Sequence, residues 1–144
     1  MAARPPREEP TLPLSNLIPA PTAAVLAAVG FLVIAGFQVA LAAGAPLGRA
    51  AWGGAVARLP SRLRRASAVS AVIWLVAAVV ILGRAGIDFV PLPDVVTSVG
   101  AWVLVALSGL GAVVNFASSS PWERFGWGPL ALVLGLLSLV VATS

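Results

Sequence analysis

TAAVLAAVGFLVIAGFQVALAAG, residues 22–44, carries no charged side chain and can cross a membrane as a single helix. A hydrocarbon core about 30 Å thick requires roughly 20 helical residues. Three further apolar segments of similar length follow, at residues 66–84, 95–116 and 121–142. They are apolar on all faces, whereas the strands of a membrane barrel alternate apolar and polar residues. The sequence therefore predicts an all-α, integral membrane four-helix bundle made of two αα-hairpins.

The composition of the whole chain supports this fold class. Of its 144 residues, 60% are hydrophobic and 10% are charged, and the mean hydropathy is +1.02. Soluble domains carry about 25% charged residues, and a small soluble domain buries too little surface to cover so much apolar chain. Cysteine and histidine are both absent, which excludes disulfides and the usual protein ligands of zinc. We therefore expect neither a metal nor another cofactor.

The ends of the apolar segments carry recognisable helix signals. Residues 1–21 are polar and rich in proline, and we expect this tail to be disordered, with the transmembrane domain over residues 22–144. Asp94 is expected to cap the third helix, because its side chain can accept an early backbone N–H. Ser120 and Glu123 have the spacing of a capping box, with a proline directly after Ser120, and predict the start of the fourth helix.

The distribution of arginine predicts the orientation in the membrane. The first loop, residues 45–67, holds five arginines, and Arg124 lies beside the third loop, residues 117–120. The opposite side has three arginines: Arg4, Arg7 and Arg84. Because basic residues near the spans favour the cytoplasm, both loops are predicted to be cytoplasmic and both termini outside. Abundant alanine, glycine, proline and arginine, with no lysine, are typical of a GC-rich bacterial genome and predict the plasma membrane.

Four polar side chains near the predicted cytoplasmic ends of the spans form the first candidate site: Gln38, Ser70, Ser108 and Asn115. They could converge as a polar cleft that faces the cytoplasm and takes a small ligand. Alternatively, they hold the helices together by interhelical hydrogen bonds, which contribute about 0.6 kcal/mol each. The capping box accounts for Glu123, and no serine is expected near a plausible base. No catalytic residue is therefore predicted.

Arginines of the first loop form the second candidate site. The expected contacts with anionic lipid head groups or an acidic membrane partner are Arg58, Arg62, Arg64 and Arg65. Arg58, Arg62 and Arg65 are predicted on one face of a helix, opposite Leu59 and Leu63. Nucleic acid is not an expected partner, because five arginines at a membrane surface match no nucleic-acid-binding motif.

Two stretches of the chain resemble a known group of proteins. They are GAPLGRAAWGG followed by LPSRLRRAS within residues 44–67, and NFASSSPWERFGWGP at residues 115–129. Together they resemble small four-span membrane proteins of unknown function from high-GC bacteria. The resemblance covers most of the membrane part and implies an architecture in which both cytoplasmic turns matter. It implies no activity and no functional residue.

These features favour a non-enzymatic role in the membrane. The leading hypothesis is an accessory or scaffold protein that associates with itself or with a larger membrane partner. It depends on the lack of charge inside the spans and on the lack of a substantial soluble domain. The alternative is a small transporter or channel subunit that uses the polar cleft. A membrane enzyme acting on lipid is the least favoured, because no catalytic constellation is present.

Overall fold

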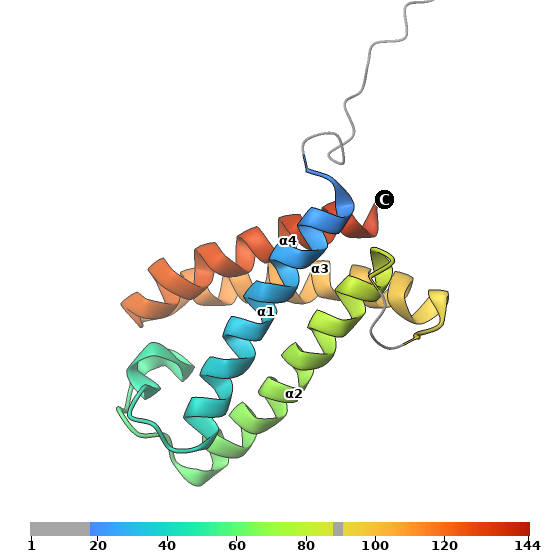
Figure 1. The fold of residues 1–144 in the computed structure, drawn as a ribbon. Helices are drawn as coiled ribbons and strands as arrows, with labels where there is room; N and C mark the ends of the chain where they lie inside the picture. The colour runs from blue at the N-terminus through green and yellow to red at the C-terminus, as the bar shows by residue number, and fades with distance from the viewer. Residues whose placement is uncertain (1–17, 88–90) are drawn as a thin grey trace, which may run out of the picture.

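The computed structural model describes residues 18–87 and 91–144, and these residues form helices and loops (Figure 1). The long helices are α1 (Ala20–Ala42), α2 (Ser61–Arg84), α3 (Asp94–Ala117) and α4 (Gly128–Ala142). The short elements are η2 (Gly48–Ala50), η3 (Trp52–Gly54) and the π-helical η4 (Glu123–Trp127), which continues directly into α4. This confirms the predicted all-α four-helix fold.

The first two helices begin ahead of the predicted spans. The first helix begins at Ala20, so the predicted tail is shorter than residues 1–21, and its first seventeen residues lie outside the described part. The second helix begins at Ser61, ahead of the predicted span at 66–84, and contains Arg62 and Arg65 as the predicted arginine face requires. The extra turn forms because Leu63 packs with buried Leu59 against the first helix, although the arginines around it are polar.

All four helices are long and apolar enough to cross a membrane. Between 22% and 39% of the most apolar window of each helix is buried inside the protein. The remaining surface is rich in valine and leucine, such as Val72 on α2, Val113 on α3 and Leu136 on α4. A water-soluble protein of this size does not expose such continuous apolar faces, whereas lipid solvates them. The helices therefore indicate a multi-pass membrane protein.

The helices pair as two hairpins that cross each other (Figure 1). Helix α1 packs along α2 and helix α3 along α4, and the hairpins meet mainly through α1 against α4 and α2 against α3. Small residues allow this close crossing. A Cβ on Gly30 would lie 2.5 Å from Leu134 Cδ2, and a Cβ on Gly100 would lie 2.6 Å from Val80 Cγ1.

The prediction that Asp94 caps the third helix is wrong. Pro93 occupies the capping position, and Asp94 is the first residue of α3, with no side-chain hydrogen bond to the backbone. The helix starts one residue early because Pro93 adopts a φ of −59° and leads straight into it. The Asp94 carboxylate still lies in the first turn, where negative charge favours the helix dipole. The Thr97 hydroxyl donates to the Asp94 carbonyl at 3.1 Å.

The ends of the four helices lie on two sides of the bundle. The start of α1 lies near the end of α4, and the loop between α1 and α2 lies near the start of α4 at the other side (Figure 1). On the first side, the Arg84 guanidinium at the end of α2 donates to the Ser144 carbonyl at 2.9 Å. On the second side, residues 48–54 fold over the bundle, and we call this segment the strap.

Candidate functional site

A cavity of about 580 Å³ lies between the helices, and residues of the strap line it. All four side chains of the predicted polar cleft line this one cavity: Gln38 from α1, Ser70 from α2, and Ser108 and Asn115 from α3. The side chains come together because the hairpins cross, which brings the loop-side halves of α1, α2 and α3 around a common space.

In the described part of the chain, none of these four side chains makes a hydrogen bond to another helix. The Asn115 Nδ2 group donates to the Gly111 carbonyl of its own helix at 2.7 Å. Within residues 18–87 and 91–144, the Ser108 Oγ and the Gln38 Oε1 are buried and have no hydrogen-bond partner. Ser108 is only 2% exposed. Leaving a buried polar group unpaired costs about 1–3 kcal/mol, so the interhelical-bond interpretation does not account for these two residues.

The prediction of a capping box at the start of the fourth helix is wrong. The Ser120 and Glu123 side chains bind residues of the strap and the turn after α3 instead of each other's backbone. The Glu123 carboxylate accepts the Gly53 N–H at 3.2 Å and also accepts the Ser118 hydroxyl. The Ser120 hydroxyl donates to the Arg49 carbonyl at 2.8 Å, and the Ser120 N–H donates to Ser118 Oγ at 3.1 Å. The strap has backbone groups without helical partners, and these groups take the side chains that would otherwise cap the helix.

The prediction that no serine lies near a base is wrong, because Ser118 contacts Glu123. Both residues line the cavity, and the hydroxyl donates to the carboxylate. Each group has a second partner, since Ser118 Oγ accepts the Ser120 N–H and Glu123 accepts the Gly53 N–H. The pair thereby connects the turn after α3 to the strap.

The strap has an unusual backbone conformation. Trp52, Gly53 and Gly54 have φ angles of 53°, 81° and 73°. The left-handed region is costly for a bulky residue such as tryptophan, so surrounding contacts must hold Trp52 in place. The Trp52 indole N–H donates to Ser67 Oγ on α2 at 3.1 Å, and the Gly53 N–H donates to Glu123.

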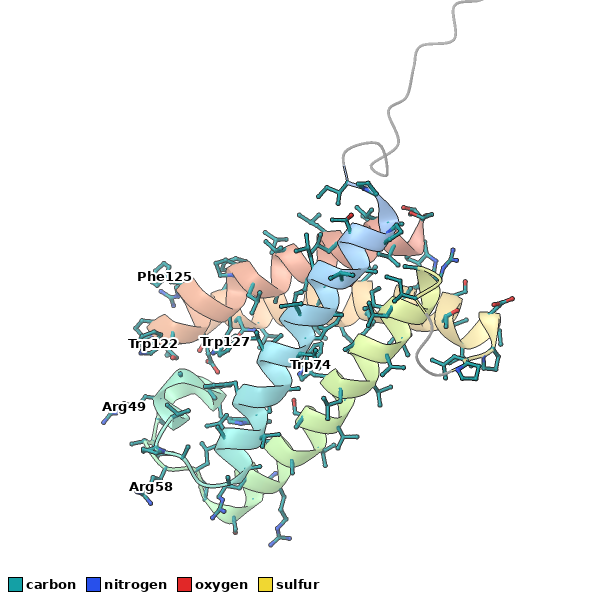
Figure 2. All side chains as sticks on the ribbon, in the orientation of Figure 1. Arg49, Arg58, Trp74, Trp122, Phe125 and Trp127 are labelled. Carbon is teal, nitrogen blue, oxygen red and sulfur yellow. The ribbon has the colours of Figure 1, made fainter. Side chains whose placement is uncertain are left out.

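Three tryptophans line the cavity: Trp52, Trp74 and Trp127. The Trp127 indole N–H donates to the Ala50 carbonyl at 2.8 Å, and its ring centroid lies 4.6 Å from that of Phe37. The Trp74 ring stacks on Phe31 at 5.4 Å. Figure 2 shows Trp74 close to the crossing of the hairpins and Trp127 nearer the strap. None of these rings is among the predicted cleft residues. Trp52 lies in the strap, Trp74 within α2 and Trp127 at the end of η4.

The arginine site differs in part from its prediction. Arg58 precedes α2, so it does not share a helix face with Arg62 and Arg65, because the helix begins only after Pro60. All three are exposed, and Arg58 points away from the helices (Figure 2). Arg64 has a structural role, because its Nε donates to the Ala42 carbonyl at 2.9 Å and satisfies the end of α1.

In the part of the chain that the structure describes, no group of three or more acidic, histidine or cysteine side chains is arranged to hold a metal ion. The cavity instead combines aromatic rings, amides, hydroxyls and one carboxylate, which suit the binding of a small organic molecule. No protein-family model matches the chain, and neither a curated protein nor a solved structure does.

Proposed function

We propose that this membrane protein binds a small molecule in the cavity between its two hairpins, as a small transporter or channel subunit. The observation that supports this most directly is that two of the four buried, unpartnered polar atoms in the described residues, Ser108 Oγ and Gln38 Oε1, belong to side chains of one cavity. Buried polar groups are nearly always hydrogen-bonded, and such exceptions call for an explanation. Both residues line a cavity of about 580 Å³, within the usual size of small-molecule sites. A bound ligand would supply the missing partners.

Transport would require the cavity to open, and the strap is the segment that could allow it. Hydrogen bonds attach it to the fourth helix segment and the turn before it: Gly53 to Glu123, Arg49 to Ser120 and Ala50 to Trp127. Opening would also detach Ala51 of the strap from the small apolar cluster that it forms with Leu41 and Leu59. With the loops 45–67 and 117–120 in the cytoplasm, the cavity would open to that side, as the arginine distribution favours.

The proposal assigns binding rather than catalysis to the cavity. The Ser118 hydroxyl and the Glu123 carboxylate are engaged with the strap and the turn, and the cavity's other lining groups are amides, hydroxyls and apolar side chains. Such groups orient a ligand and discriminate between ligands.

The test is a thermal-shift screen of the purified protein in detergent against water-soluble small molecules. A ligand of the cavity raises the melting temperature of the wild type and loses its effect on Ser70→Leu, because leucine fills part of the cavity. The matched control is Val69→Leu, whose neighbouring position is 61% exposed on the outer face of the same helix. If no compound stabilises the wild type, or if Ser70→Leu responds like Val69→Leu, the cavity is not a ligand site.

The accessory or scaffold role is the second candidate, and two helix surfaces favour it. Gly36 on α1 and Gly109 on α3 are exposed, and a Cβ at either position would meet nothing within 4 Å. Glycines on apolar helix faces let another helix approach closely, either from a second copy or from a larger membrane partner. Gentle purification at native expression, followed by mass spectrometry, tests this role. A stoichiometric membrane partner that Gly109→Leu removes would support it, and recovery of the monomer alone would contradict it.

Anionic lipid remains the proposed contact of the exposed arginines Arg58, Arg62 and Arg65. The expected attraction is about 1 kcal/mol for each arginine near an anionic surface. Neutralising all three should weaken binding to vesicles that contain phosphatidylglycerol and leave binding to neutral vesicles unchanged. An equal effect on both vesicle types would contradict the contact.

A further inference from the structure

The charge and the aromatic rings of the cavity together restrict the ligand class. Among the described residues that line it, Glu123 alone has a formal charge, although the chain as a whole carries a net charge of +4. Arg49 belongs to the strap but points away from the helices (Figure 2). Glu123 is half-buried, so water screens its attraction for a cation less than it would screen that of a fully exposed carboxylate.

Tryptophan rings add a second attraction for positive charge. A cation over the face of an indole is stabilised, and tryptophan is the best of the aromatic side chains for this purpose. The Trp52 and Trp127 rings are held by their N–H groups, which donate to Ser67 Oγ and to the Ala50 carbonyl. Phe31 stacks on the Trp74 ring. The three rings are therefore oriented before a ligand arrives, which lowers the entropic cost of binding.

The unpartnered atoms indicate what else the ligand carries. Gln38 Oε1 is an acceptor, so it requires an N–H or O–H donor. Ser108 Oγ can accept or donate. An anion is repelled by Glu123, whereas an ammonium group supplies both the positive charge and an N–H donor for Gln38.

We infer that the cavity selects organic ammonium ions with an apolar body. The positive group lies among the tryptophan rings near Glu123, and one of its N–H groups donates to Gln38 Oε1. The inference rests on the proposed ligand-binding function. One nearby positive charge opposes the selectivity, since the Arg124 guanidinium donates to the Ser118 carbonyl at 2.8 Å. Arg124 does not line the cavity, and removing its charge should strengthen binding of a cation.

The test compares 2-phenylethylammonium with 2-phenylethanol by isothermal titration calorimetry of the full chain in detergent micelles. Empty micelles provide the blank for partitioning. The two probes have nearly the same shape, and both can donate a hydrogen bond, so a difference in affinity reports the charge. The wild type is expected to bind the ammonium about tenfold more tightly than the alcohol.

Variants separate the sources of this preference. Glu123→Gln keeps an acceptor for the Gly53 N–H and should abolish most of the preference, whereas Asp94→Asn, at the other side of the bundle, should leave it unchanged. Trp74→Leu, which lies away from the strap, should lower ammonium affinity about threefold or more, with a smaller effect on the alcohol. Arg124→Gln should raise ammonium affinity.

The outcomes distinguish the two proposals. Equal affinity of the wild type for both probes overturns the cation preference and leaves the ligand site standing. A preference that survives unchanged in both Glu123→Gln and Trp74→Leu also overturns it. If neither probe binds the wild type, the cation preference and the ligand site for molecules of this size both fail.

Discussion

The Glu123 carboxylate accepts the backbone N–H of Gly53 at 3.2 Å, across 70 residues of sequence. Through this contact, the loop between α1 and α2 becomes a wall of a cavity that helices of both hairpins also line. The contact therefore joins the two hairpins at the side of the bundle where the cavity lies.

Removing the Glu123 side chain should loosen the strap. Glu123→Ala leaves the Gly53 N–H and the Ser118 hydroxyl without their acceptor, at a cost of about 0.5–1.5 kcal/mol, because water can reach the exposed Gly53 N–H. Glu123→Gln should cost less, because its amide oxygen still accepts the Gly53 N–H. Hydrogen exchange followed by mass spectrometry should show faster exchange over residues 48–54 in the alanine variant. Unchanged exchange in these residues would mean that the contact does not hold the strap.

The two strap glycines should differ in their tolerance of alanine. Both have positive φ, so alanine is strained at either position by roughly 1–2 kcal/mol. A Cβ at Gly53 meets nothing within 4 Å, whereas a Cβ at Gly54 would lie 2.9 Å from the Arg49 carbonyl oxygen and 3.0 Å from Ser120 Cβ. Thermal unfolding should therefore show Gly54→Ala to be clearly less stable than Gly53→Ala. Equal melting temperatures would contradict the close approach of the strap to the start of the fourth helix.

A side chain added at Gly30 should destabilise the crossing of the hairpins. A Cβ there would lie 2.5 Å from Leu134 Cδ2, and Leu134 is 1% exposed, so it has little room to move. Gly30→Ala should destabilise the fold by about 1–3 kcal/mol, and Leu134→Ala should relieve part of this cost in the double variant. Gly36→Ala, on the same helix with open space, should be neutral or slightly stabilising. Additive effects of Gly30→Ala and Leu134→Ala would show that the two residues do not touch.

Alanine substitution of two buried serines should change the stability of the ligand-free protein differently. Ser108 and Ser120 are 2% and 3% exposed. The Ser120 hydroxyl donates to the Arg49 carbonyl, so Ser120→Ala should cost about 1 kcal/mol. The Ser108 hydroxyl has no partner in the described structure, so Ser108→Ala should be neutral or stabilising. Equal destabilisation of both variants, measured by chemical unfolding in detergent, would mean that Ser108 has a partner.

The absence of cysteine makes the predicted orientation directly testable. Ala57→Cys lies in the first loop and Pro91→Cys lies just before α3, and both positions are exposed. With the first loop in the cytoplasm, a membrane-impermeant thiol reagent added to intact cells should label Pro91→Cys and spare Ala57→Cys. Labelling should become equal after the membrane is permeabilised. The reverse pattern in intact cells would place both termini in the cytoplasm.

Composition and local pattern determined a large part of this fold. The uncharged run at residues 22–44 and its three counterparts specify four helices, because a span needs only length and apolar side chains. The depth of the polar residues along each span also followed from the sequence. Gln38, Ser70, Ser108 and Asn115 therefore came out on one cavity, since residues at a similar depth in neighbouring helices lie close together.

Tertiary structure alone decided how the turns are used. The spacing of Ser120 and Glu123 is that of a capping box, yet their side chains bind Arg49, Gly53 and Ser118 instead. A local pattern records which partners are near along the chain. It does not record which backbone groups another loop leaves unpaired, and the crossing of the hairpins brings the strap within reach. The same crossing forms the cavity. Its carboxylate and its tryptophan rings come from segments that meet only after the hairpins pack.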